Sequence, residues 1–125
     1  MRKALLLSAC LLVACDQAGR EQDFEALGSP RGDLILITTV IAPWLPLGQH
    51  RVAVYLQVGR EAARQRLAST ELAYDGVPFT RQNIAMRWVA DDEALVCLRA
   101  SDRPDKSFHV KVEGEQATAR LAPGC

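Results

Sequence analysis

Apolar residues recur at every second position in several short stretches of this chain, and this alternation limits the possible fold more than any other feature. The clearest stretch runs from Arg51 to Val58, where polar or small residues occupy one set of alternate positions. The other set is Val52, Val54, Leu56 and Val58. Because successive side chains of a strand point to opposite sides, a period of two predicts a β-strand with one buried face.

The same pattern predicts further strands along the rest of the chain. They are expected over residues 68–74, 84–88, 94–100, 108–112 and 116–121. Residues 34–41 (LILITTVI) are apolar or β-branched on both faces, which is typical of a strand covered on both sides. Residues 59–67 give a mixed signal for a loop or a short helical turn. Six or seven short strands separated by turn residues predict an all-β chain, with residues 33–125 forming a single β-sandwich.

The first residues have the pattern of an export signal. A basic start at Arg2 and Lys3 is followed by an apolar run and by the sequence Leu12-Val13-Ala14-Cys15. A cysteine directly after a small residue resembles the signal of bacterial lipoproteins. That resemblance implies cleavage after residue 14, a diacylglycerol thioether on Cys15 and an acyl chain on its new amine. Three acyl chains would give effectively permanent membrane anchoring.

Two other interpretations of this segment fit less well. A transmembrane helix needs about 20 apolar residues, whereas Ala4 to Ala14 supplies 11. Leu7-Ser8-Ala9-Cys10 also fits the lipoprotein pattern, but it leaves only residues 4–8 as the apolar region. Such regions need roughly 7 to 15 residues, so Cys15 is the expected site of lipidation.

Residues 15–32 are predicted to be a lipidated, flexible tether. The stretch is polar, and Gly19, Gly28, Pro30 and Gly32 interrupt any regular element. A flexible segment of 17 residues spans about 23 Å on average, which would let the domain stand off the membrane. Phe24 and Leu27 could dock on the domain, although a solvated linker is the simpler interpretation.

The remaining cysteines are candidates for a disulfide. If the signal is removed and Cys15 carries lipid, Cys97 and Cys125 are left in an exported protein, where disulfides form. A bond between them would close a loop of about 29 residues and contribute roughly 3.6 kcal/mol in the chain-entropy model. Two free thiols, with Cys97 packed in a strand, are the alternative.

The sequence offers little for catalysis, metal binding or nucleic acid. Its two histidines, His50 and His109, are expected to face solvent, and Asp91-Asp92-Glu93 falls in a predicted hairpin turn. We find no nucleophile elbow, HExxH helix, phosphate-binding glycine loop or CxxC pair. Without the signal the chain carries 13 basic and 15 acidic residues, so no strong field attracts nucleic acid. We therefore expect a non-enzymatic protein without metal or cofactor.

One apolar segment is a candidate for partner binding. Residues 42–48 place Trp44, Leu45 and Leu47 next to two rigid prolines. Exposed, these side chains would form a hydrophobic contact for another protein. They could equally cap the core of the sandwich at a corner.

Three short motifs resemble the YscW-like group of small lipoproteins, which includes the type III secretion pilotins of the ExsB type. They are Leu45-Pro46-Leu47-Gly48, Val52-Ala53-Val54-Tyr55-Leu56 and Asp75-Gly76-Val77-Pro78-Phe79-Thr80. The resemblance covers roughly residues 43–104, together with the lipidation signal and the size of the chain. It implies a β-sandwich that binds a secretin subunit near its C-terminus and carries that subunit to the outer membrane. The partner segment would add a strand to a sheet edge or lay an amphipathic helix in an apolar groove.

The residue after the lipidated cysteine influences which membrane a lipoprotein is sorted to. In enteric bacteria, an aspartate such as Asp16 tends to retain lipoproteins in the inner membrane, whereas a pilotin acts at the outer membrane. The expected location is therefore a membrane surface that faces the periplasm, with the outer membrane favoured and the inner membrane open. Other functions for such a domain are a periplasmic inhibitor or immunity lipoprotein and a carrier of small apolar ligands.

Overall fold

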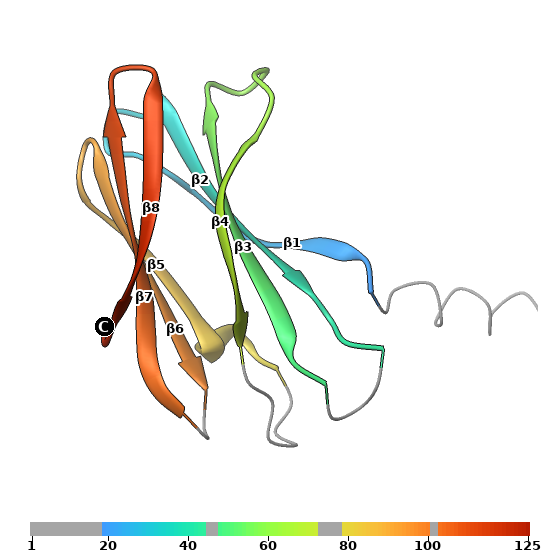
Figure 1. Cartoon of the computed structure of the whole chain (residues 1–125). Coiled ribbons are helices and arrows are strands. Elements are labelled where there is room, and N and C mark those ends of the chain that lie inside the picture. Colours follow the sequence, from blue (N-terminus) through green and yellow to red (C-terminus); the bar gives the residue numbers. More distant parts are fainter. Residues whose placement is uncertain (1–18, 45–47, 73–78, 101–102) are drawn as a thin grey trace, which may run out of the picture.

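The computed structural model describes residues 19–44, 48–72, 79–100 and 103–125. Within these residues the chain forms eight strands and one short 3-10 helix, η1 (Figure 1). The strands are β1 (Glu21–Gly28), β2 (Leu34–Ile41), β3 (His50–Val58), β4 (Gln65–Leu72), β5 (Ile84–Ala90), β6 (Glu93–Ala100), β7 (Arg103–Glu113) and β8 (Gln116–Pro123). Helix η1 spans Arg81–Asn83 and is capped by the Thr80 side chain, which accepts from the N–H of Gln82.

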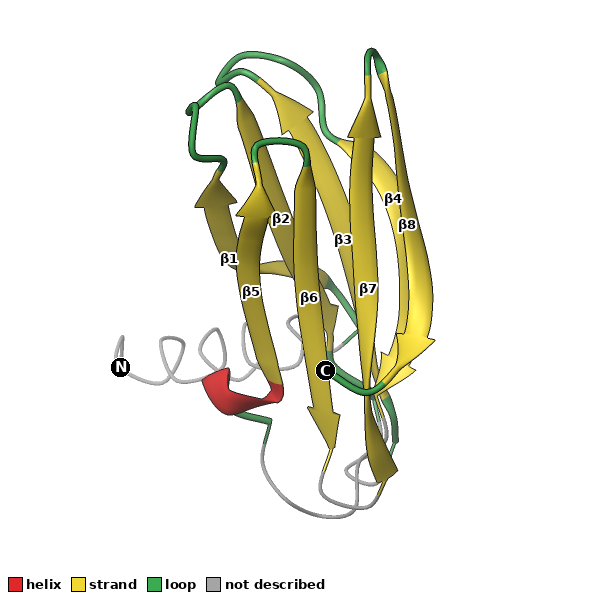
Figure 2. Cartoon of the chain, turned by 90° about the vertical axis from the view of Figure 1, so that its left-hand side faces the viewer, coloured by secondary structure: helices red, strands yellow, loops and turns green. Residues whose placement is uncertain are grey.

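The strands form two antiparallel sheets that pack face to face (Figure 2). Sheet A has the order β1-β2-β3-β4 and sheet B the order β5-β6-β7-β8, so each sheet is one continuous meander. The segment between β4 and β5 carries the chain from one sheet to the other. The β-sandwich predicted from the alternation of apolar residues is thereby confirmed.

The predicted tether is wrong over residues 21–28, because these residues form β1 and extend the sandwich at its N-terminal end. Strand β1 pairs with β2 from Glu21 opposite Ile41 to Gly28 opposite Ile35. A β-bulge between Asp23 and Glu25 breaks the alternation that would have marked the segment as a strand. As an edge strand it is also largely exposed, and four of its eight residues are polar. The domain therefore begins before residue 33, and the strands number eight rather than six or seven in the described residues.

The core lies between the inner faces of the two sheets. Leu36, Val52 and Val54 of sheet A and Val96, Leu98 and Phe108 of sheet B are almost completely buried. Burying each such side chain is worth about 1.5–3 kcal/mol. Side chains of this cluster occupy the space between the sheets, which is where a carrier of apolar ligands would need a cavity.

Hydrogen bonds also connect the two sheets on both sides of the sandwich. Trp88 of β5 donates its indole N–H to the carbonyl of Leu27 in β1 at 3.0 Å. At the other side, the ammonium of Lys106 in β7 donates to Thr70 Oγ1 at 3.0 Å and to the carbonyl of Glu71 at 2.6 Å. Partial burial at this bridge lowers the pKa of Lys106.

The outer face of sheet A is covered by its own side chains. The Glu21 carboxylate accepts from Thr39 Oγ1 at 2.5 Å and from the Tyr55 hydroxyl at 2.6 Å. These hydrogen bonds lower the pKa of Glu21 and raise that of Tyr55. Beside them, Ile37 on the same face is only 2% exposed. The prediction that residues 34–41 are covered on both sides is therefore confirmed at the centre of β2.

In the described ranges, the structure contains no helix that is long and apolar enough to cross a membrane.

Candidate binding surface

Three of the predicted site residues, Cys15, Leu45 and Leu47, lie outside the described residues. Trp44 is described and is 73% exposed. It lies against Gly19, where an added Cβ would collide with the indole ring. The Gly19 N–H donates to the carbonyl of Ala42 at 3.0 Å, which holds the start of the described chain beside the β2–β3 connection.

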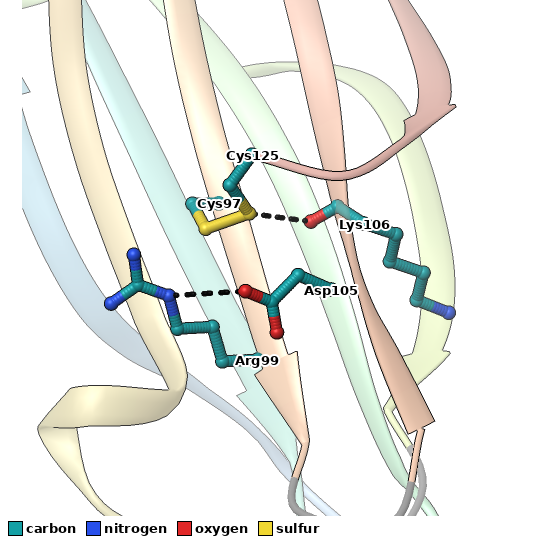
Figure 3. Close-up of a disulfide and its surroundings, with 5 residues drawn as sticks. All are labelled: Cys97, Arg99, Asp105, Lys106 and Cys125. Carbon is teal, nitrogen blue, oxygen red and sulfur yellow. Dashed lines mark hydrogen bonds and ion pairs between the residues drawn. A yellow bond between two sulfur atoms is a disulfide. The ribbon is translucent and has the colours of Figure 1, made fainter.

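The disulfide between Cys97 and Cys125 is present, with Cα atoms 5.5 Å apart. Cys97 lies on the outer face of β6, and the chain reaches it by crossing over β7 after β8 ends (Figure 2). Gly124 donates its N–H to the carbonyl of Asp105 at 2.8 Å, and Cys125 Sγ lies 3.4 Å from the carbonyl oxygen of Lys106 (Figure 3). The C-terminal residues are thus fixed across the outer face of sheet B.

Asp105 lies close enough to the two sulfurs to complete a three-ligand metal site, with its ligand atom and theirs all within 4.8 Å of one another. The sulfurs are bonded to each other, however, so neither is a thiolate that could bind a metal. The Asp105 carboxylate instead faces the guanidinium of Arg99 at 3.6 Å (Figure 3).

The C-terminal crossing forms one wall of a hollow on the outer face of sheet B. This surface, which we call the sheet B hollow, has a volume of about 820 Å³ and includes Pro123, Gly124 and Cys125 in its lining. Its centre is a row of four residues that face one another across the strands. In order from β5 to β8 they are Arg87, Leu95, His109 and Arg120.

The sheet B hollow combines basic and apolar groups. Among the described residues, Arg87, His109 and Arg120 take part in none of the ion pairs or side-chain hydrogen bonds. By contrast, the ammonium of Lys111 in the same hollow pairs with Glu93 at 3.2 Å, which raises its pKa. Leu95 lies between the basic side chains, and Val89 at the edge of the hollow is 52% exposed.

Ser107 adds an unsatisfied polar group to the lining of the hollow. The side chain is on the outer face of β7, between Cys97 and Ala122 in the neighbouring strands, and is 1% exposed. Its hydroxyl finds no hydrogen-bond partner among the described residues. Leaving a buried hydroxyl without a hydrogen bond typically costs about 1–3 kcal/mol. A polar atom of a ligand that reached Ser107 would therefore gain a favourable hydrogen bond.

A second, smaller hollow contains an aromatic cluster and is also lined by the polar residues Arg20, Gln22 and Asp23. Phe79 packs edge-on against Phe24 with ring centroids 5.7 Å apart, and it stacks on the His50 ring at 4.7 Å. These three residues line a hollow of about 360 Å³ together with Val40 and Ala42. The expectation that both histidines face solvent is therefore right for His109 and wrong for His50, whose pKa is lowered by burial.

The acidic cluster of residues 91–93 lies in the β5–β6 hairpin, as predicted. Asp91 pairs with Arg31 at 3.0 Å, and Glu93 pairs with Lys111. The two carboxylates are bound to different cations, as is common for exposed acids at a turn.

Sequence reasoning did not single out the sheet B hollow. Arg87, His109 and Arg120 each lie on the polar, exposed face of a different strand and look like ordinary solvated side chains. Only the strand register brings them into one row, and that register depends on the three pairings that join the four strands β5 to β8.

No protein-family model, curated protein or solved structure matches this chain.

Proposed function

We propose that this protein is a non-enzymatic, lipid-anchored escort of the pilotin type. In this proposal the lipid on Cys15 holds the domain at a membrane that faces the periplasm, with the outer membrane as the working site. The domain binds a C-terminal segment of a secretin subunit and promotes its targeting and assembly there. The lipidation signal and the resemblance of residues 43–104 to YscW-like lipoproteins support this function.

The observation that carries the proposal is the sheet B hollow. It presents Leu95 between basic side chains that have no acidic partner among the described residues, and Val89 at its edge. This chemistry suits an amphipathic segment with an apolar stripe and acidic residues beside it. A secretin segment of that kind would neutralise Arg87 and Arg120 while it covers the apolar floor.

The dimensions of the hollow favour a helix laid on the sheet over a strand added at its edge. The basic row crosses from β5 to β8, which is three strand spacings or about 14 Å. A helix with side chains is about 10–12 Å across. The C-terminal wall would stop the helix from sliding off one side of the sheet.

Membrane anchoring explains why binding a secretin segment would help the secretin to assemble. Secretin subunits expose apolar barrel surface before assembly and are prone to aggregate in that state. An escort that holds one segment and is itself fixed in a bilayer raises the concentration of subunits at that bilayer. No catalytic group is needed for this role.

The test is to measure secretin multimers in outer-membrane fractions of strains that lack this protein or carry variants of it. Deletion should reduce the multimers, and Arg87→Glu combined with Arg120→Glu should do the same while the protein remains folded and lipidated. Arg60→Glu is the matched control because Arg60 is an exposed arginine in the connection between β3 and β4, outside the hollow.

Unchanged multimers in the deletion strain would overturn the pilotin function. If deletion reduces the multimers but the double variant supports them fully, the hollow is not the secretin site. Recovery of a soluble periplasmic enzyme, and no secretin, with the purified protein would favour the inhibitor function instead.

A further inference from the structure

The described chain begins very close to the predicted lipid. Only residues 16–18 separate Cys15 from Gly19, and Gly19 is already bonded to the carbonyl of Ala42. Four steps of extended chain span at most about 14 Å. If Cys15 is lipidated, Gly19 therefore lies within that distance of the acyl chains, and the domain cannot stand far from the bilayer.

The part of the sandwich beside Gly19 carries the most exposed large apolar side chain among the described residues, Trp44. In Figure 1 the start of β1 and the end of β2 meet at the lower right of the sandwich. We call this the anchor end. Tryptophan prefers the boundary between a bilayer and water, because its ring is apolar and its N–H is polar.

Further apolar groups lie next to Trp44. The aromatic hollow with Phe24, His50 and Phe79 opens at the same end, and it shares Ala42 with the chain segment that leads to Trp44. These groups give the anchor end an apolar surface that extends beyond a single side chain.

Charge differs between the two ends of the sandwich. Arg20, Arg81 and Arg103 lie at the anchor end, near the starts of β1, β5 and β7. Among the described acidic residues at this end, Glu21 is bonded to Thr39 and Tyr55, Glu71 to Arg51 and Asp105 to Arg99. The connections at the opposite end carry five acidic residues, Asp33, Glu61, Asp91, Asp92 and Glu115, against three arginines, Arg31, Arg60 and Arg64. Bilayers with anionic lipids attract basic residues near their surface.

We propose that the anchor end, centred on Trp44, rests on the lipid bilayer in the anchored protein. This inference rests on the lipidation of Cys15 in the proposed function. The chain length from Cys15 to Gly19 brings the surface to the bilayer, and Trp44 with the arginines suits the bilayer interface. The sheet B hollow runs along the side of the sandwich and stays accessible to a partner.

The experiment uses the full, lipidated protein in phospholipid vesicles that contain anionic lipid and either ordinary or brominated acyl chains. Bromine quenches tryptophan only where the ring enters the bilayer. We expect loss of the Trp44 emission in brominated vesicles, seen as a difference between the wild type and Trp44→Phe. In Trp44→Phe the remaining Trp88 is bonded to Leu27 inside the sandwich and should keep its emission.

Val58→Trp in the Trp44→Phe background is the matched control. Val58 is 63% exposed and ends β3 at the side opposite His50, so a tryptophan there should not be quenched. Equal quenching at positions 44 and 58 would overturn the orientation, because it would mean that the domain lies on its side or tumbles into the bilayer.

The mass of the processed protein reports lipidation separately. A lipidated protein whose Trp44 emission is unaffected by brominated lipid overturns this inference and leaves the anchor standing. In that case, a change in Trp44 emission on adding the secretin segment would assign Trp44 to the partner, as the sequence predicts. A protein without lipid overturns both the anchor and the orientation.

Discussion

The guanidinium of Arg64 donates two hydrogen bonds to the carboxylate of Asp23, each at 2.6 Å. Asp23 lies in β1 and Arg64 directly precedes β4, so this one pair joins the two edge strands of sheet A across its outer face. The pair lowers the pKa of Asp23 and raises that of Arg64.

Replacing Arg64 should loosen β1. The two side chains are 41% and 58% exposed, so solvent screening limits the pair to about 1 kcal/mol or less. We expect Arg64→Ala to lower the free energy of unfolding by that amount and to speed amide exchange in β1 more than in β6. Arg64→Lys keeps the charge but cannot donate two parallel hydrogen bonds to the carboxylate. Its free energy of unfolding should therefore fall between those of the wild type and Arg64→Ala. Uniform acceleration over both sheets would contradict this role.

Acid should weaken the same strand. Both Glu21 and Asp23 have pKa values below their ordinary values of 4.5 and 3.8. A lowered folded-state pKa means that the carboxylate stabilises the fold above the ordinary value and loses that contribution as pH falls through the lowered one. Urea unfolding from pH 6 downward should therefore show declining stability below about pH 4.5. The decline should be smaller in Glu21→Gln combined with Asp23→Asn, and an unchanged pH profile in that variant would refute the assignment.

Breaking the disulfide should cost stability and disturb the sheet B hollow. The bond closes a loop across a sequence separation of 28 residues, and the chain-entropy model predicts a loss of about 3.6 kcal/mol on its removal. Urea unfolding of Cys125→Ser and of the reduced wild type measures this loss. Because Pro123, Gly124 and Cys125 form a wall of the hollow, we expect the same variant to bind the proposed partner, a secretin segment, more weakly. Full affinity without the bond would show that the wall is dispensable.

The hydrogen bond from Trp88 to Leu27 should stabilise the contact between β5 and β1. Trp88→Phe keeps the ring in the sandwich and removes the N–H, leaving the Leu27 carbonyl without that donor. We expect a loss of about 1 kcal/mol, measured by urea unfolding. Trp44→Phe is the control and should change stability little, since Trp44 is exposed. Equal effects at the two positions would argue against a specific role for this bond.

Removing the lipid attachment site should detach the protein from membranes. Cys15→Ser should leave an uncleaved precursor or release the protein into the soluble fraction, because no thioether can form. Fractionation with detection of precursor and processed forms checks this. Firmly membrane-bound and processed Cys15→Ser would show that the lipid is attached elsewhere, and Cys10→Ser then tests the other candidate.

The strands that face the core could be predicted from the sequence because their pattern is local. The alternation of Val52, Val54 and Leu56 predicts β3 without information from any other segment. The disulfide could be predicted by elimination. Once the signal is removed and Cys15 carries lipid, Cys97 and Cys125 are the two cysteines left.

Strand β1 could not be predicted because the residues that stabilise it are distant in the sequence. Half of its residues are polar and its alternation is broken by the bulge at Asp23, so the segment looks like a linker. What holds it is pairing with β2 and the bonds to Tyr55 and Arg64, which lie 34 and 41 residues further along the chain. The sheet B hollow was missed for the same kind of reason, since Arg87 and Arg120 become neighbours only after four strands are paired.

The continuous meander of each sheet has a consequence for how the chain folds if it is exported as proposed. Every strand pair of sheet A is complete once Leu72 has crossed the membrane, whereas sheet B and its disulfide need the chain up to Cys125. During translocation from the N-terminus, sheet A can therefore assemble while the second half is still in the export channel. Until β5 to β8 arrive, Leu36, Val52 and Val54 have no opposing layer. In the proposed function, the nascent protein thus passes through a stage in which it is prone to aggregate while its lipidated start is already held at the bilayer.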